Sequence, residues 1–110
     1  MARTLLEYLY EDGRSPFGRW LDGLAAPAAA RVTAALYRLE AGPFGNTKSV
    51  GGGVCEYRVN FGPGYRIYFG QDGDSLVILL AGGTKKRQQQ DIELARSRWQ
   101  DYKRRKRAGR

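Results

Sequence analysis

Apolar and polar residues alternate in two neighbouring segments in the second half of the chain. In residues 54–61, one side takes Cys55, Tyr57, Val59 and Phe61 and the other takes Glu56, Arg58 and Asn60. In residues 65–70, Arg66 and Tyr68 lie opposite Tyr65, Ile67 and Phe69. A period of two is typical of strands with one buried face. Tight turns at residues 62–64 and 72–73 predict antiparallel pairing of these strands with the apolar segment 76–81.

A period near 3.6 marks the helices. Ser15 and Pro16 are a typical helix start, and Pro27 opens a second helix that should end at Gly42-Pro43. A last helix is expected from about Lys86, with an apolar stripe at Ile92, Ala95, Trp99 and Tyr102. Residues 4–10 are rich in strand formers, and residues 44–53 are expected to form a loop. The order β-α-α-β-β-β-α predicts an α+β fold with a mostly antiparallel sheet, two helices on one face and a C-terminal helix.

Composition narrows the possible chemistry. The 110 residues suit one domain, predicted to span residues 1–102, and no apolar run is long enough for a bilayer span. The start leads directly into a strand-like segment, so a cytoplasmic location is expected. The chain has one cysteine, Cys55, and no histidine, which argues against a disulfide, a Cys/His metal site or histidine acid–base catalysis. We expect neither a metal nor a cofactor.

The net charge of +8 lies entirely in the last quarter of the sequence. Residues 1–84 carry eight basic and eight acidic side chains, whereas residues 85–110 carry eleven basic and three acidic ones. This asymmetry favours a polyanionic partner such as nucleic acid or the ribosome. A solvated tail at residues 103–110 that merely aids solubility is the alternative.

The alternation gathers possible catalytic groups on one face of the sheet. Glu56, Arg58, Arg66 and Tyr68 should be near neighbours there. A carboxylate, two guanidinium groups and a phenol are enough to cleave RNA without metal, because a 2′-hydroxyl must lose a proton and a phosphorane must be stabilised. The competing interpretation is a Glu56–Arg66 ion pair on a solvated sheet face.

Residues 82–87 read Gly-Gly-Thr-Lys-Lys-Arg and follow the apolar strand. They do not match a P-loop, and a strand-to-helix turn would place Lys85 near a helix N-terminus, where backbone amides also attract anions. An ordinary loop with exposed lysines is equally compatible with this motif. Further candidates for RNA binding are Lys48, Lys86, Arg87, Lys103, Arg104 and Arg105.

Several motifs occur together in one order. They are Val-Cys-Glu-Tyr-Arg-Val at 54–59, Gly-Pro-Gly-Tyr-Arg-Ile-Tyr-Phe at 62–69, Leu-Leu-Ala-Gly-Gly-Thr-Lys at 79–85, and Gln88 with Asp91-Ile92 and Ala95. Upstream, residues 15–21 and 42–48 fit the same series. From about Leu5 to Tyr102 the chain resembles the HigB-like addiction-module killer proteins of the RelE/ParE toxin superfamily.

The resemblance implies a type II toxin that enters the ribosomal A site, cuts messenger RNA and is neutralised by a helix-turn-helix antitoxin. It implies phosphate-binding roles for Arg58, Arg66 and Lys85, and Glu56 is similar to the strand carboxylate that some relatives use as a base. Tyr65 and Tyr68 flank Arg66, and the strand alternation favours Tyr68 as the one that faces the substrate. The chain departs from the family in lacking histidine near its C-terminus and in its basic run at residues 103–107. A ParE-like inhibitor of DNA gyrase and a catalytically inactive relative that binds nucleic acid or antitoxin are the alternatives.

Overall fold

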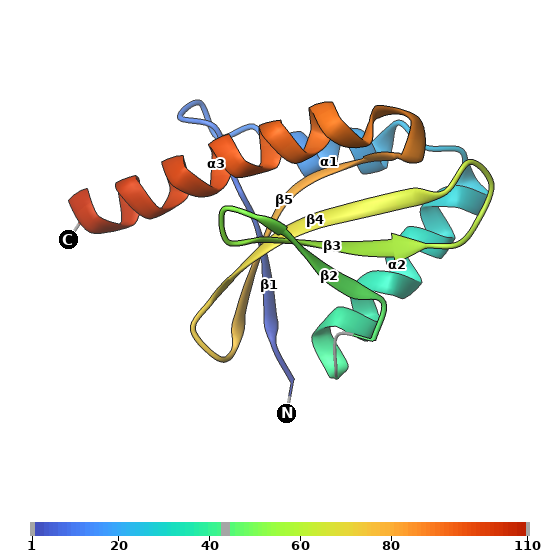
Figure 1. Ribbon diagram of the computed structural model, residues 1–110, viewed down its shortest axis with the longest axis horizontal. Coiled ribbons are helices and arrows are strands. Elements are labelled where there is room, and N and C mark those ends of the chain that lie inside the picture. The colour runs from blue at the N-terminus through green and yellow to red at the C-terminus, as the bar shows by residue number, and fades with distance from the viewer. Residues whose placement is uncertain (1, 43–44, 110) are drawn as a thin grey trace.

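A five-stranded mixed sheet lies between two layers of helix in this α+β protein (Figure 1). The computed structural model describes residues 2–42 and 45–109. In chain order the elements are β1 (Thr4–Glu7), α1 (Pro16–Asp22), α2 (Ala26–Ala41), β2 (Thr47–Gly51), β3 (Val54–Val59), β4 (Tyr65–Asp72), β5 (Leu76–Thr84), the 3₁₀ turn η1 (Lys85–Arg87) and α3 (Gln88–Ala108).

The strand order is β1-β5-β4-β3-β2. Strands β2 to β5 form an antiparallel meander. The tight turns at residues 62–64 and 72–73 predict this pairing for β3, β4 and β5. Strand β1 pairs in parallel with β5, with Leu5 opposite Val77. The expected α+β class is confirmed, and the sheet is mixed because β1 runs parallel to β5 whereas the other neighbouring strands are antiparallel.

Strand β2 lies where the sequence predicted a loop, and the observed order therefore contains one strand more than expected. Gly51, Gly52 and Gly53 all have positive φ angles, of 92°, 66° and 85°. Glycine adopts this backbone without the steric penalty of other residues, so the three together form the reversal that pairs β2 with β3. Pro43, at the expected end of the second helix, and Phe44, at the expected start of the loop, lie outside the described residues.

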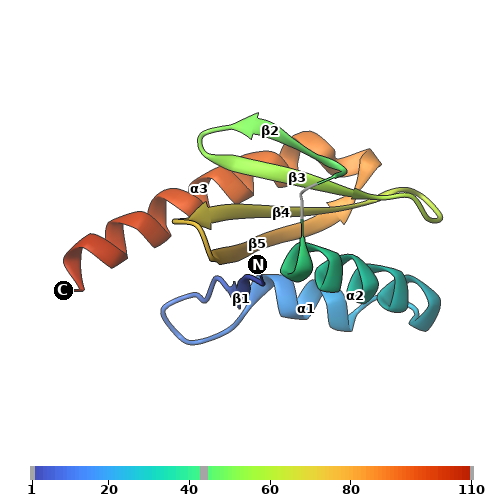
Figure 2. The same cartoon turned by 90° about the horizontal axis from the view of Figure 1, so that it is seen from below.

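Helices lie on both sides of the sheet (Figure 2), and each face carries its own hydrophobic core. Helices α1 and α2 cover one face, where Tyr57, Val59, Ile67 and Phe69 from β3 and β4 are buried. This confirms the apolar face inferred from the alternation. Helix α3 covers the other face, where its stripe of Ile92, Ala95 and Trp99 packs on Tyr68 and Leu80.

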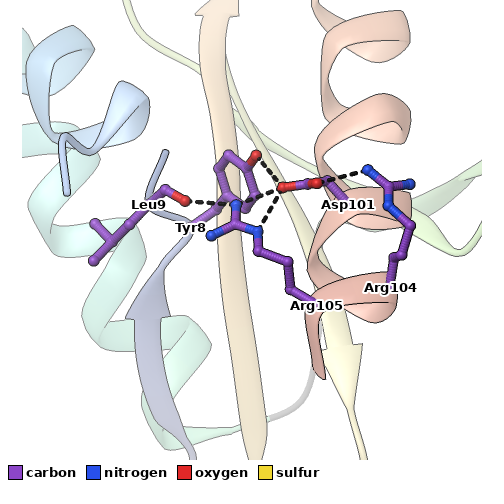
Figure 3. Close-up of polar contacts among 5 residues, drawn as sticks. All are labelled: Tyr8, Leu9, Asp101, Arg104 and Arg105. Carbon is purple, nitrogen blue, oxygen red and sulfur yellow. Dashed lines mark hydrogen bonds and ion pairs between the residues drawn. The ribbon is translucent and has the colours of Figure 1, made fainter. Parts of the chain in front are cut away.

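Polar contacts fasten the C-terminal half of α3 to the end of β1 and to the β4–β5 turn. The Tyr8 hydroxyl donates to Asp101 at 2.7 Å, and the Arg105 guanidinium donates to the Leu9 carbonyl at 2.7 Å (Figure 3). The Tyr102 hydroxyl donates to Asp72 at 2.6 Å. These contacts lower the pKa of Asp101, because Tyr8 and Arg105 both hydrogen-bond to its carboxylate.

Helix α3 continues unbroken past Tyr102, the predicted end of the domain, to Ala108. Lys106 pairs with Asp72 at 2.7 Å, so the basic segment contacts the sheet within the helix. Arg110, the last residue of the expected tail, lies outside the described residues. None of the helices in residues 2–42 and 45–109 has both the length and the apolar character needed to cross a bilayer.

A chain that ends after Tyr102 should still fold but be less stable. It loses the Arg105 and Lys106 contacts and keeps the whole apolar stripe. We expect the free energy of unfolding to fall by about 1–2 kcal/mol, because exposed ion pairs contribute only about 0.2–1 kcal/mol each. Urea unfolding measures this, with a chain that ends after Lys106 as the control. An unfolded short chain would show that residues 103–106 are essential to the domain.

Gly70 on β4 should not tolerate a side chain. A Cβ there would overlap the ring of Trp99 on α3. Gly70→Ala should therefore lower the free energy of unfolding by about 1–3 kcal/mol, as overpacking of a filled core does. Gly42→Ala is the matched control, because no heavy atom lies within 4 Å of the added Cβ. Equal stability of the two variants would disprove the close approach of α3 to the sheet.

Candidate functional site

Two rows of paired residues cross the sheet on the face that α3 partly covers. Residues directly opposite on antiparallel strands point to the same side. The first row runs from β2 to β5 through Lys48, Glu56, Tyr68 and Ala81, and the second runs through Arg58, Arg66 and Gly83. Glu56, Arg58, Arg66 and Tyr68 therefore share one face of β3 and β4, as the alternation predicts.

At the centre of this face lies a buried ion pair. Nε of Arg66 is 2.8 Å from Oε2 of Glu56, and the two side chains are 9% and 0% exposed. Its N–H is not aligned on that oxygen, so the contact is ionic rather than a well-directed hydrogen bond. Gln88, in the first turn of α3, donates its amide to both Glu56 oxygens, at 3.0 and 3.2 Å. The solvated ion pair considered from the sequence is thus a buried one.

Tyr68 belongs to the core under α3 rather than to a solvent-facing surface. Its side chain is 0% exposed, and its hydroxyl has no hydrogen-bond partner among the described residues. Burial, with the Glu56 and Asp91 carboxylates nearby, raises the pKa of the phenol well above its usual value. Tyr68 was expected to face a substrate, and α3 separates it from solvent here.

Asp91 is a second buried carboxylate at the same place. It lies directly over Gly83, where any Cβ would overlap its carboxylate. Its Oδ2 has no hydrogen-bond partner among the described residues. Burial raises the pKa of Asp91, and the positive charges of Arg87 and Arg98 offset part of that increase.

The exposed cations form a rim around this buried centre. Lys48, Arg58 and Lys85 are exposed. The Gly64 carbonyl accepts the Lys85 backbone N–H at 2.9 Å and makes a long 3.5 Å contact with the Arg66 guanidinium. The β3–β4 turn therefore holds Lys85 beside Arg66. Residues 85–87 form η1 between β5 and α3, in agreement with the expected strand-to-helix turn. Lys86 and Arg87 are exposed on the same turn.

The candidates on the far half of α3 lie elsewhere. Sixteen residues separate Gln88 from Arg104, which corresponds to about 24 Å along a helix axis. Arg104 and Arg105 pair with Asp101, and the Lys103 ammonium lies 5.7 Å from the centre of the Trp99 ring. The structure thus brings Lys48, Arg58, Arg66 and Lys85 around Glu56, and it places Lys103, Arg104 and Arg105 on a separate surface.

Comparison with known proteins identifies the family. Residues 19–100 match the family described as phage-derived protein Gp49-like (DUF891). The chain belongs to the Gp49-like family. It is also 43% identical, over 81 residues, to an uncharacterized protein of Haemophilus influenzae, a match that covers 73% of this chain and 82% of that protein. The Gp49-like family is associated with toxins of toxin–antitoxin systems, and a toxin role is consistent with this membership.

Gln88 and Asp91 were not among the candidate site residues, although both appear in the motif series. Their signal is positional: they follow Lys85 by three and six residues and open the last helix. A period of 3.6 would place both near the face of α3 that also carries Ile92 and Ala95. Polar residues such as Gln88 and Asp91, which lie beside the apolar stripe at the start of the helix, indicate that the helix start contacts the strands on which it packs.

The free energy of unfolding of Asp91→Asn, measured relative to that of the wild-type chain, should increase as the pH rises from acidic to neutral. The raised pKa means that the folded state binds the Asp91 proton more tightly than the unfolded chain does. The contribution of Asp91 to wild-type stability therefore falls as pH rises from about 4 through the folded pKa of Asp91, and the variant lacks this loss. Urea unfolding at pH 4 to 7.5 measures the difference, with exposed Asp74→Asn as control. A pH-independent difference would contradict the desolvation of Asp91.

Proposed function

We propose that this Gp49-like protein is the toxin of a type II toxin–antitoxin pair, related to the RelE/ParE toxins, and that it cleaves messenger RNA on the ribosome without a metal. The observation that carries the proposal is Arg66, held by a buried carboxylate and flanked by the exposed cations Arg58 and Lys85. A surface that merely needed solubility has no use for a guanidinium fixed in this way.

Arg66 suits the demands of phosphodiester cleavage. In the proposed step the 2′-hydroxyl loses its proton to water and bonds to phosphorus, and the bond to the 5′-oxygen breaks as that oxygen takes a proton from water, which leaves a 2′,3′-cyclic phosphate. The phosphorane formed on the way carries an additional negative charge. Arg66 sits within the long strand β4, and Glu56 restrains its Nε. A guanidinium so restrained requires little reorganisation when that charge develops, and its fork can donate two parallel hydrogen bonds to phosphate. Arg58 and Lys85 supply the neighbouring positive charge.

Glu56 acts on Arg66 rather than on the substrate in this proposal. Its side chain is fully buried, and its two oxygens contact Arg66 and Gln88. The base expected from the resemblance would have to accept a proton from a bound ribose, which this enclosure prevents. Tyr68 is equally buried and is likewise a structural residue in this proposal. The chain's own substrate contacts are then the guanidinium groups of Arg58 and Arg66 and the ammonium of Lys85.

The proposed partners follow from the charge. The exposed lysines and arginines of η1 and α3 suit ribosomal RNA as well as messenger RNA, which implies action in the cytoplasm. A helix-turn-helix antitoxin would neutralise the toxin by laying an acidic segment over the Arg58 and Lys85 side of the sheet or over the basic half of α3. Charge complementarity of this kind favours rapid and specific association.

Arg66→Ala should lower the single-turnover rate of messenger RNA cleavage on programmed ribosomes by about a hundredfold or more, by analogy with loss of one preorganised oxyanion donor. Arg66→Lys should restore little activity, because an ammonium lacks the fork, although it keeps a positive charge beside Glu56 and so protects the fold. Ribosome binding should change much less than the rate. Exposed Arg14→Ala, which removes the same charge, should cleave normally.

The activity itself is tested first by primer extension on messenger RNA after brief expression of the wild-type chain. New 5′ ends in phase with codons are the expected result. Intact messenger RNA with stalled replication would instead indicate a ParE-like action on DNA gyrase. Normal cleavage by folded Arg66→Lys protein would remove the guanidinium from the mechanism and leave the Glu56–Arg66 pair as a structural feature.

A further inference from the structure

A hollow lies at the edge of the sheet where β3 extends beyond β2. Strand β2 pairs with β3 only as far as Tyr57, so on the side away from β4 the segment from Arg58 to Asn60 has no strand beside it in the described structure. The backbone N–H of Arg58 donates instead to the Asn46 carbonyl at 3.3 Å. Between this edge and helix α2 the hollow has a volume of about 320 Å³. We call it the arginine pocket.

Three arginines and two asparagines supply its polar lining. Arg31 and Arg38 come from α2, Arg58 from β3, and Asn46 and Asn60 from the segments beside the strand, while no carboxylate is among the described lining residues. Arg31 and Arg38 are seven residues apart, which places them on one side of the helix. Arg31 is held over the ring of Phe61, 4.6 Å from its centre.

This charge has no counterpart within the described chain. None of the three arginines forms an ion pair there. Arg58 also lies directly opposite Arg66, and like charges opposite one another destabilise a sheet. Glu56 offsets the charge of Arg66, so Arg31, Arg38 and Arg58 are the positive charges around the pocket that an anion bound there would balance.

The lining indicates a nucleotide rather than a simple anion. Guanidinium groups bind phosphate through paired hydrogen bonds. Asparagine amides both donate and accept, which suits the edge of a base and is not required by a carboxylate-bearing peptide. A volume of about 320 Å³ falls at the lower end of small-molecule sites, in keeping with a single nucleotide. Arg58 belongs both to this pocket and to the row that contains Arg66, so one RNA strand could contact both.

We infer that the arginine pocket is a subsite for the nucleotide next to the cleaved bond, with its phosphate on Arg31, Arg38 and Arg58 and its base against Asn46 and Asn60. The inference rests on the proposed nuclease function and extends it. It attributes part of the preference for particular RNA sequences to the arginine pocket, which lies outside the Glu56–Arg66 centre.

The test uses the full chain with Arg31 and Arg38 both changed to Gln. Both positions are exposed on α2, so the fold should be retained. Fluorescence anisotropy with a single-stranded RNA oligonucleotide should show at least about tenfold weaker binding, and the slope of log K against log salt should fall by about 0.7 for each phosphate that the variant no longer binds. The control changes exposed Arg14 and Arg19 to Gln and should leave affinity nearly unchanged, although it removes the same charge. Equal weakening by both variants would overturn the subsite.

Cleavage kinetics separate this inference from the nuclease proposal. In the Arg31/Arg38 variant KM should rise with kcat nearly constant, since the contacts serve binding in both ground and transition states. Cleavage with an unchanged KM would overturn the subsite and leave the nuclease standing. Pocket-dependent RNA binding by a wild-type chain that never cleaves would support the pocket and overturn the nuclease. If the variant loses affinity for an acidic antitoxin peptide while keeping that for RNA, the pocket belongs to a protein partner.

Asn60→Ala distinguishes base contact from phosphate contact. It should alter the relative affinities for oligo(A), oligo(C) and oligo(U) while leaving the salt slope unchanged, because phosphate contacts position RNA and base contacts discriminate among sequences. An unchanged order of affinities would exclude Asn60 from base recognition.

Discussion

The ion pair between Glu56 and Arg66 is the interaction on which the candidate site depends. A carboxylate that is fully buried must be compensated, because loss of one partner of a buried pair costs about 3–5 kcal/mol. Gln88 adds two hydrogen bonds from above, and those bonds require α3 to begin over β3. The position of α3, the enclosure of Glu56 and the restraint on Arg66 therefore depend on one another.

Glycines on the strands let the helices come close enough to the sheet to complete the arrangement around Glu56. Gly70 and Gly83 occupy the α3 face of β4 and β5, under Trp99 and Asp91, and Gly82 lies under Trp20 on the opposite face. At each position a single added carbon would overlap the side chain above it. Close packing of this kind fixes α3 along the sheet, and with it the distance between Gln88 and Glu56.

The sequence predicted the parts of this arrangement that depend on local pattern. Alternation along residues 54–61 and 65–70 placed Glu56 and Arg66 on one face, because a period of two follows from strand geometry. It did not predict that α3 encloses Glu56 and Tyr68, since the apolar stripe of a helix shows which side packs but not where on a sheet it lies. Strand β2 was missed because Thr47–Gly51 lacks alternation and runs into glycines. Arg31, of the inferred subsite, was not a candidate from the sequence because only the tertiary fold brings it to the same pocket as Arg58.

The distribution of charge changes meaning once the fold is known. By sequence, the whole excess of +8 lies in residues 85–110, yet Arg104, Arg105 and Lys106 are paired with Asp101 and Asp72. Arg31, Arg38 and Arg58 belong to the half of the chain that is neutral overall, and they face one pocket without a carboxylate among its described lining. Net charge governs long-range attraction to a polyanion, whereas unpaired charges that converge decide where it is held. If the proposed RNA binding holds, these physical grounds place the contacts that set the register of the RNA at the sheet edge, and they leave the C-terminal half of α3 mainly a source of long-range attraction.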